Sequence, residues 1–374
     1  MNAAIAALRS RTPRRPTWSE TASIVIPVVF AVAIAYTEVG ARHADVLAYD
    51  FWRNVWSFDR DVLAGISPYR EPAGSAAVDD SGVYPPFAPL LFMPLALLPY
   101  APAAALWSLG LLASLGLALW LVGVRDWRCY AWLPVSLPVL NGFLILGNIT
   151  VLLTLCFAVA WRWRERPLLA GVALGAAFVA KPFLFPLVVW LLATRRYRAA
   201  ATATVTTALA LGVSWAAIGF DGLLDYPRLT QVVADRYQSE GVSTVAAAVD
   251  LGLSETTGRA VGIGLGLALL ALGAGLARRP DGDLPAFSLS IGATLVLSPV
   301  AWYHYLVLLL VPAAIRFPRL GAIWFLPLVF WISQGPLLFL AVATFILTAT
   351  TLRTNAVTGL AAIFAGRLRS ERIR

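Results

Sequence analysis

The sequence is short of charged residues and of cysteine. Only 13% of its 374 residues are charged and 59% are hydrophobic, whereas about a quarter of the residues in an average soluble domain are charged. Two cysteines, Cys129 and Cys156, are too few and too far apart for a disulfide framework or a cysteine-based metal site. The sequence shows no fixed-period repeat, no low-complexity tract and no obvious metal cluster. The shortage of charged residues and the excess of hydrophobic residues argue against a soluble globular protein.

The hydrophobic residues are gathered into blocks that short polar stretches separate. A helix needs about 20 apolar residues to cross a bilayer, and several blocks approach that length. We therefore predict an all-α, polytopic membrane protein, a single integral membrane domain (1–374) with about 12 transmembrane helices. The expected segments are 22–38, 86–98, 102–124, 130–146, 148–163, 167–180, 182–194, 199–218, 259–277, 284–300, 303–315, 320–333 and 336–352.

The net charge of +9 could indicate a nucleic-acid partner, but the arginines favour another explanation. They cluster in short loops and at both termini, as the positive-inside rule predicts for the cytoplasmic side. We expect no nucleic-acid partner, and we read the first segment as a retained signal anchor rather than a cleaved signal peptide. The expected cytoplasmic stretches are the tails 1–21 and 353–374 and the loops 162–166, 195–198, 277–280 and 316–319.

Alternating crossings then place two polar loops, 39–84 and 219–257, outside the membrane. The short segment 86–98 must be a partial or hairpin element if Arg125 and Arg128 are cytoplasmic. Everything polar that could do chemistry gathers on this outer side.

The first outer loop contains an amphipathic helix over 51–63. Phe51, Val55, Phe58 and Val62 fall on one face at helical spacing, and tryptophans widen that face. An apolar face with tryptophans opposite charged residues is typical of a helix that lies in the membrane interface.

Asp50, just before that helix, has two possible roles. As a helix N-cap, its carboxylate would accept hydrogen bonds from first-turn amides. As a chemical group, it would face a lipid-borne substrate at the membrane surface. Asp59 and Asp61 point in opposite directions on a helix and are expected on a solvated face.

Four more polar residues lie at predicted membrane boundaries, and each has a structural explanation as well. Tyr84 precedes a Pro-Pro pair that could simply start a helix. Asn148 sits between two apolar segments. Lys181, the only lysine, could snorkel to the interface, and His304 could be an interfacial histidine among belt aromatics.

The ordered set "DFWRNVWSFDRDVLAGISPY", "VYPPF", "LGNIT", "AKPF" and "SPVAWYHY" resembles the C-type (GT-C) glycosyltransferases. It is most similar to glycosyltransferase family 87, typified by polyprenol-phosphate-mannose-dependent α-mannosyltransferases, over roughly residues 20–350. Where family members often carry Gly-Gln-x-Asn, this chain has only Asn148.

The resemblance implies a membrane enzyme of the cell envelope. It would transfer a hexose, with mannose as first choice, from a polyprenyl-phosphate donor to a glycolipid or cell-envelope glycan acceptor. The transfer would take place outside the membrane, with inversion and without a metal or other cofactor. Asp50 is the expected catalytic base, with Asp45 as the alternative. The expected donor-phosphate and substrate-binding residues are Lys181, His304, Arg228, Arg236, Asn148 and Tyr84.

A multi-pass lipid or sugar transporter or flippase is the alternative, because Gly- and Pro-interrupted apolar helices also occur in transporters. Transporters usually carry polar residues inside their spans, whereas here the expected spans are nearly free of ionisable groups.

Overall fold

The structure is a computed structural model, and it describes residues 47–69 and 83–352 together with a few isolated residues between 22 and 37. Within these residues all regular secondary structure is helical, which confirms the all-α prediction. Asp45, most of the expected first segment and both basic tails lie outside the described residues.

The helices follow one another with short connections. Their order is α3 (Tyr49–Phe51), η2 (Trp52–Trp56), α4 (Ser57–Leu63), α5 (Phe87–Leu91), α6 (Met93–Ala96), α7 (Tyr100–Leu121), α8 (Trp127–Trp132), η3 (Leu133–Val135), α9 (Leu137–Leu140), η4 (Asn141–Ile145), α10 (Thr150–Arg162), α11 (Pro167–Ala180), η5 (Pro182–Leu184), α12 (Leu187–Ala193), α13 (Tyr197–Ala217), α14 (Tyr226–Tyr237), α15 (Thr244–Asp250), α16 (Glu255–Leu276), α17 (Asp283–Leu297), η6 (Tyr303–Leu309), α18 (Leu310–Arg316), α19 (Ala322–Phe325), η7 (Leu326–Trp331) and α20 (Pro336–Thr351).

Several predicted segments are broken, and proline explains the breaks. The expected segment 130–146 divides into α8, η3, α9 and η4, with Pro134 and Pro138 each near the start of a new piece. Proline lacks an amide hydrogen and collides with the preceding turn, so a helix restarts there. The expected element 86–98 is likewise only the two short helices α5 and α6, as a partial or hairpin element requires.

Three described helices, α7, α13 and α16, are long and apolar enough to cross a membrane. The segments Leu137–Ile145 and Thr150–Arg162 could together form a fourth crossing, bent by 114° at their junction. Further apolar helical stretches of 10–17 residues, some of them formed by two consecutive helices, are shorter than these three helices. The count of about 12 crossings therefore stays a prediction.

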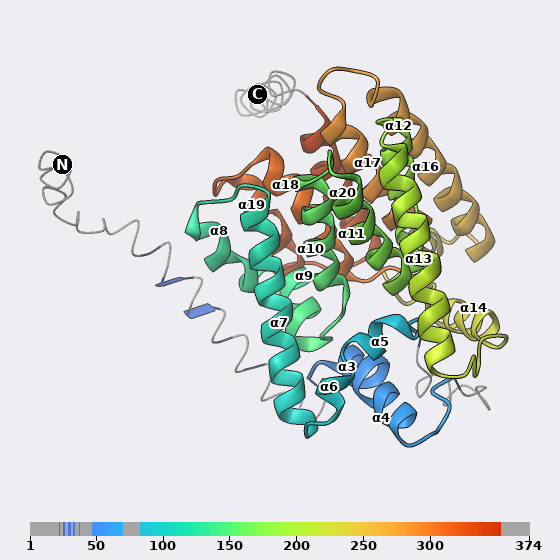
Figure 1. Cartoon of the computed structure of the whole chain (residues 1–374). Helices are drawn as coiled ribbons and strands as arrows, with labels where there is room; N and C mark the ends of the chain where they lie inside the picture. Colours follow the sequence, from blue (N-terminus) through green and yellow to red (C-terminus); the bar gives the residue numbers. More distant parts are fainter. Residues whose placement is uncertain are drawn as a thin grey trace, which may run out of the picture.

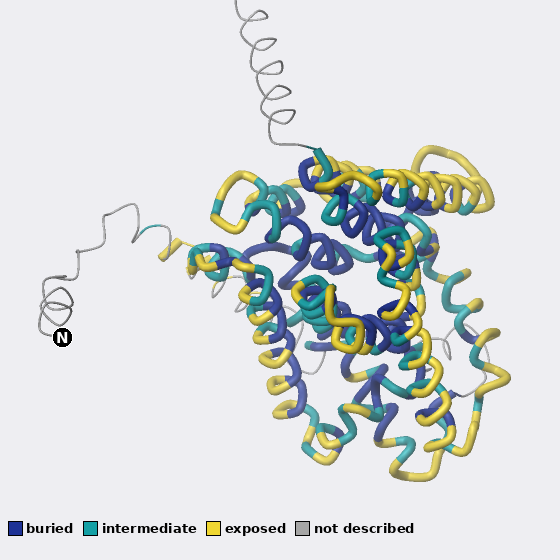
Figure 2. Tube along the Cα trace, turned by 45° about the horizontal axis from the view of Figure 1, so that its top comes forward, coloured by how far each residue is buried: buried dark blue, intermediate teal, exposed yellow. Residues whose placement is uncertain are grey.

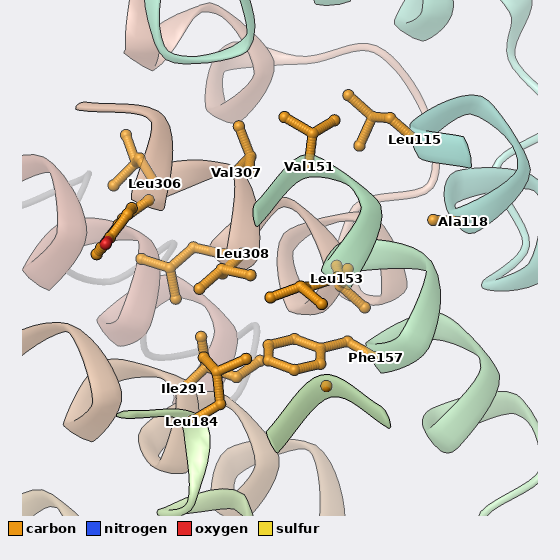
Figure 3. Packing of buried hydrophobic residues seen from close by; sticks show 14 of the residues in the cluster. Leu115, Ala118, Val151, Leu153, Phe157, Leu184, Ile291, Leu306, Val307 and Leu308 are labelled. Atoms are coloured by element: carbon orange, nitrogen blue, oxygen red, sulfur yellow. The ribbon is translucent and has the colours of Figure 1, made fainter. Parts of the chain in front are cut away.

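The centre of the bundle is formed by α10 together with α7, α11, α17 and η6. Phe157, Leu153 and Val151 of α10 are buried there against Leu308 and Ile291 (Figure 3). Figure 2 shows the buried chain inside the bundle and the exposed residues around it. The outward faces of α13 and α16 remain apolar, as expected for helices in contact with lipid.

Close contact between α11 and α13 depends on small residues. A Cβ added to Gly175 would lie 2.6 Å from the Thr206 Cβ, and Gly171 meets Thr202 in the same way. Glycine at both positions lets the two helices approach, as small residues do in membrane bundles.

The connections α10–α11, α12–α13 and α16–α17 meet at one end of the molecule, which we call the arginine end. Helix α7 runs from α6 toward this side, so the α7–α8 connection lies there too (Figure 1). Asp283 accepts hydrogen bonds from Arg164 (2.7 Å), Arg196 (2.8 and 2.9 Å) and the Trp190 indole (2.7 Å). Arg196 also pairs with Glu165. The loops 162–166 and 195–198 are thus joined by charge to each other and to the start of α17, which follows the loop 277–280. All three loops are expected on one side of the membrane.

The first-loop helices α3 to α6 and the second-loop helix α14 lie at the opposite end (Figure 1), which we call the loop end. Tyr69 and Tyr226 bring the two loops together, because their rings pack at 5.4 Å. The two loops that the sequence places on the outer side therefore share one end of the bundle.

Candidate functional site

The first-loop helix runs almost without interruption from Tyr49 to Leu63, with a π-helical turn over Trp52–Trp56. This agrees with the helix predicted over 51–63. Ala48 precedes it with φ 56°, and no side chain caps its first turn. Asp50 lies inside that turn, so the N-cap explanation of this carboxylate is wrong.

Three residues of the apolar face of this helix pack inside the protein, whereas the sequence predicted that this face contacts lipid. Phe51 stacks on Trp107 at 4.9 Å and Phe58 packs edge-on against Tyr69 at 5.4 Å. Both side chains and Val55 are buried inside the protein. The amphipathic pattern is real, but its partner is α7 and the neighbouring loop, because a helix buries its apolar stripe against whatever apolar surface the fold supplies.

Asp59 also departs from expectation. It was expected on a solvated face but is 0% exposed, and neither of its carboxylate oxygens has a hydrogen-bond partner among the described residues. Burial raises the pKa of this carboxyl to about 7, because the charged form loses its hydration.

The start of the first-loop helix is docked against the break between α9 and α10. Ala48 donates its amide to the Leu144 carbonyl (3.0 Å) and Asp50 donates its amide to Leu146 (2.7 Å). Gly147 has φ +59°, and a Cβ there would lie 2.7 Å from the Ala48 Cβ. Glycine is needed both for the backbone conformation and for this close approach.

Asn148 orients the Asp50 carboxylate. Its Oδ1 accepts hydrogen bonds from the Thr150 amide (2.9 Å) and hydroxyl (2.6 Å). These two hydrogen bonds fix the orientation of the carboxamide, so that its Nδ2, which can only donate, points toward Asp50. That Nδ2 donates to Asp50 Oδ2. The lone asparagine of the "LGNIT" motif therefore contacts the predicted base directly.

Lys181 follows the end of α11 and is only 6% exposed. Its ammonium donates to the Tyr305 hydroxyl (3.3 Å) and lies 4.7 Å from the Tyr305 ring centroid, 5.3 Å from that of Tyr84 and 5.8 Å from that of Phe183. Aromatic faces within about 6 Å attract a cation. The side chain is therefore enclosed in an aromatic cage and does not snorkel to a free surface.

His304 completes the buried group. Its Nδ1 lies 3.4 Å from Asn141 Oδ1, and its Nε2 has no hydrogen-bond partner in the described part of the chain. A buried polar atom without a partner is uncommon, so Nε2 is available to a bound molecule.

Opposing effects act on the ionisation of Asp50. Burial raises the pKa of its carboxyl, while the hydrogen bond from Asn148 and the charges of Lys181 and Arg53 act to lower it, and the net shift is upward. The result is a carboxyl poised closer to neutral pH than an exposed aspartate.

The structure thus gathers five of the predicted residues, namely Asp50, Tyr84, Asn148, Lys181 and His304. Arg228 and Arg236 are instead exposed on α14, and Arg236 pairs with Glu240. Asp45 lies outside the described residues. Within the described ranges, no group of three His, Cys, Asp or Glu residues could hold a metal ion.

A cavity of about 180 Å³ opens elsewhere, between α14, α15, α16 and the end of α17. None of the predicted site residues lines it. Its lining is Gln231, Ala234, Thr244, Val245, Arg259, Gly262, Ile263, Val296, Leu297, Ser298 and Pro299.

Sequence reasoning missed two residues of the site. Arg53 acts on Asp50 through its charge, and its position three residues later on a helix was a usable signal. Tyr305, interpreted as a belt aromatic, binds Lys181 instead. No local pattern pairs residues 124 positions apart, so this contact was not visible in the sequence.

Comparison with known proteins identifies the family of the chain. The model of glycosyltransferase family 87 matches residues 83–299, more than half of the chain. The chain is 31% identical over 277 residues to a polyprenol-phosphate-mannose-dependent alpha-(1-2)-phosphatidylinositol pentamannoside mannosyltransferase of Mycolicibacterium smegmatis. It is 30% identical over 280 residues to the protein of the same name from Mycobacterium tuberculosis.

Each alignment covers 68% of this chain but only 61% and 58% of the two relatives, so it spans less than two thirds of their length. No solved structure matches. The match extends from the Val83–Tyr84 segment through Asn148 and Lys181. On these grounds the chain belongs to glycosyltransferase family 87.

Proposed function

We propose that this chain transfers mannose from a polyprenyl-phosphate donor to a glycolipid acceptor. The observation that carries the proposal is the hydrogen-bonded Asp50–Asn148 pair beside the caged ammonium of Lys181. Both matched relatives are named for polyprenol-phosphate-mannose and for a phosphatidylinositol mannoside, which supports this donor and a lipid-linked acceptor.

Asp50 acts as the base. The acceptor hydroxyl attacks the anomeric carbon of mannose and gives its proton to the Asp50 carboxylate, while the bond from that carbon to the phosphate oxygen breaks. A raised pKa suits this task, because a general base works best near the operating pH. The hydrogen bond from Asn148 fixes one oxygen of the carboxylate.

Lys181 stabilises the leaving group. A polyprenyl phosphate gains negative charge as it departs and needs cations and hydrogen-bond donors rather than an acid. The Lys181 ammonium supplies a compact charge in a desolvated place, and the Tyr84 hydroxyl and His304 Nε2 have no partners of their own among the described residues. Direct displacement inverts the anomeric centre.

The loop end faces the outer side of the membrane in this proposal, and the arginine end faces the cytoplasm. Cysteine labelling tests it in a background without Cys129 and Cys156. Leu224, 91% exposed in the second loop, should react as Leu224→Cys with an impermeant thiol reagent on intact cells. Arg279→Cys, exposed at the arginine end, should react only after lysis. The reverse pattern contradicts the orientation.

Transfer itself is tested with purified protein, radiolabelled polyprenyl-phosphate-mannose and a lipid extract. We expect label in an acceptor lipid, released as mannose by an α-mannosidase. Protein in vesicles that moves labelled donor between leaflets and forms no labelled product would instead indicate the flippase alternative.

A further inference from the structure

The Val83–Tyr84 segment is held almost entirely by side chains. No helix covers these two residues, and Pro85 and Pro86 behind them lack amide hydrogens. The Val83 amide donates to Asn54 Oδ1 (3.0 Å), and the Val83 carbonyl accepts from the Tyr226 hydroxyl (3.0 Å). The Tyr84 carbonyl accepts from the Tyr69 hydroxyl (2.7 Å). Side chains from other parts of the chain therefore fix the position of the Val83–Tyr84 segment.

Asn54 connects the segment to the base. While its Oδ1 accepts from Val83, its Nδ2 donates to the Asp50 carbonyl (3.1 Å). The side chain is buried in the first-loop helix. One carboxamide thus spans the gap between the backbone of Asp50 and the backbone beside Tyr84, with both of its ends engaged.

Tyr226 and Tyr69 connect the segment to the second loop. Both rings pack with Trp215, at 5.7 and 4.9 Å, and their hydroxyls reach adjacent carbonyls of the segment. Gly222, with φ +75°, lies so close to Tyr69 that a Cβ would collide with it. These contacts therefore fix the distance between the second loop and the Val83–Tyr84 segment.

The other side of the segment faces Lys181. The Tyr84 ring is one wall of the aromatic cage, 5.3 Å from the ammonium. A displacement of Val83 and Tyr84 would move that wall with respect to Lys181, and with respect to Asp50 through Asn54.

We propose that Asn54 and Tyr226 are positioning residues, which set the distance from the Asp50 carboxylate to Lys181 through the Val83–Tyr84 backbone. The inference rests on the proposed function for its catalytic consequence but not for its geometry. Asn54 connects the Val83–Tyr84 backbone to Asp50, and Tyr226 connects it to the second loop.

The geometric part is tested without any substrate. Lys181 is the only lysine, so protein grown with lysine labelled with ¹³C at Cε alone gives one side-chain resonance, which aromatic ring currents shift. Tyr226→Phe removes one hydroxyl and keeps the ring. We expect it to move the Lys181 resonance, and we expect Asn54→Asp, which keeps the acceptor but loses the donor, to move it too.

The matched control is Tyr130→Phe. The Tyr130 hydroxyl also donates to a backbone carbonyl, that of Val124 at 2.9 Å, but in the connection before α8. We expect the Lys181 resonance to stay in place in this variant. Unmoved resonances in Tyr226→Phe and Asn54→Asp, with the three proteins melting alike, overturn the inference.

Kinetics test the catalytic part. A small displacement of reacting groups costs much rate, so we expect kcat to fall about tenfold in Tyr226→Phe, with the KM for donor within about twofold because no donor contact is removed. A shifted resonance with unchanged kcat overturns the catalytic role. A wild-type protein that transfers no mannose contradicts the proposed function, while the resonance still decides the geometry.

Discussion

The carboxyl groups at the two ends of the molecule differ in their surroundings and in the direction of their pKa shifts. At the arginine end, Arg128 donates to Asp126 with two of its nitrogens (2.9 and 2.8 Å) and holds the pKa of that carboxyl at about 2. At the loop end, burial raises the pKa of Asp59 to about 7 without any partner, and it raises that of Asp50. The paired carboxyl serves the structure, whereas carboxyls with raised pKa values are typical of functional sites.

Among the variants that test this contrast, Asp50→Asn should have the largest effect on the transfer rate. If the carboxylate takes the proton, transfer should fall by about 10²–10⁴-fold, which is the usual contribution of a general base. Asn148 and the fold should tolerate the isosteric change. Asp126→Asn, the matched change at the arginine end, should leave kcat unchanged. Near-normal transfer by Asp50→Asn would remove Asp50 from the mechanism.

The same residue predicts a pH dependence. The raised pKa of Asp50 means that the base becomes active only as pH rises through that value. The acid limb of kcat/KM should therefore lie above pH 4, the range of an ordinary aspartate. An acid limb at or below pH 4, measured between pH 3.5 and 8, contradicts this assignment.

The next largest effect is expected for Lys181→Met. This change keeps the length of the side chain and removes its charge, so loss of leaving-group stabilisation should lower kcat by about 10²-fold. Lys181→Arg should recover part of the rate. Arg125→Met is the control, because Arg125 also lies over an aromatic ring, that of Trp120 at 4.6 Å, but at the arginine end. Equal rates in Lys181→Met and Arg125→Met would leave Lys181 a structural residue.

Asp59→Asn should change stability and its pH dependence. The pKa of Asp59 is about 7 in the folded protein against 3.8 ordinarily, so its stabilisation is complete below pH 4 and is lost as pH rises through 7. From pH 5 to pH 7 the wild type should lose about 2–3 kcal/mol relative to Asp59→Asn, at about 1.4 kcal/mol per pKa unit. Thermal unfolding in detergent at both pH values measures the difference. Parallel pH profiles would show that Asp59 does not titrate there.

The smallest effect is expected at the arginine end itself. Asp283→Asn weakens the pairing of Arg196 and Arg164, but the Asp283 side chain is 27% exposed, so the cost should be only about 1–2 kcal/mol, below that of a fully buried pair. The activity per folded molecule should not change. Glu165→Gln is the control, because its side chain is 75% exposed and surface pairs contribute about 0–1 kcal/mol. A loss of kcat in Asp283→Asn would show that the two ends are coupled.

Much of the site could be predicted, because its residues interrupt an otherwise apolar sequence. Asn148, Lys181 and His304 each stand beside an apolar segment, where a polar group needs a reason, whereas Asp50 lies in a charged loop and was assigned through the family resemblance. The helix over 51–63 followed from its periodicity. Its burial did not, because an apolar stripe fits a membrane surface and a protein interior equally well in pattern.

The remaining features depend on contacts between distant parts of the chain. Asp59 looked solvated because its neighbours in sequence are polar, yet the fold covers it. Asn54 binds Val83, 29 positions away, and no local pattern pairs these two residues. Helix breaks were also harder to predict than helices, since an uninterrupted apolar run does not show where each proline will bend the chain.

The long reach of the Lys181–Tyr305 contact has a consequence for how the protein is made. The two residues are 124 positions apart, and Asp50 and Asn148 are 98 apart. During synthesis, Asp50 can meet Asn148 well before Tyr305 has left the ribosome, whereas the cage around Lys181 has to wait for it. Contacts of such separation form late and slowly, so Lys181 lacks its Tyr305 partner until most of the chain has been synthesised. Mutations that delay the insertion of η6 should therefore lower the yield of protein before they affect any catalytic step.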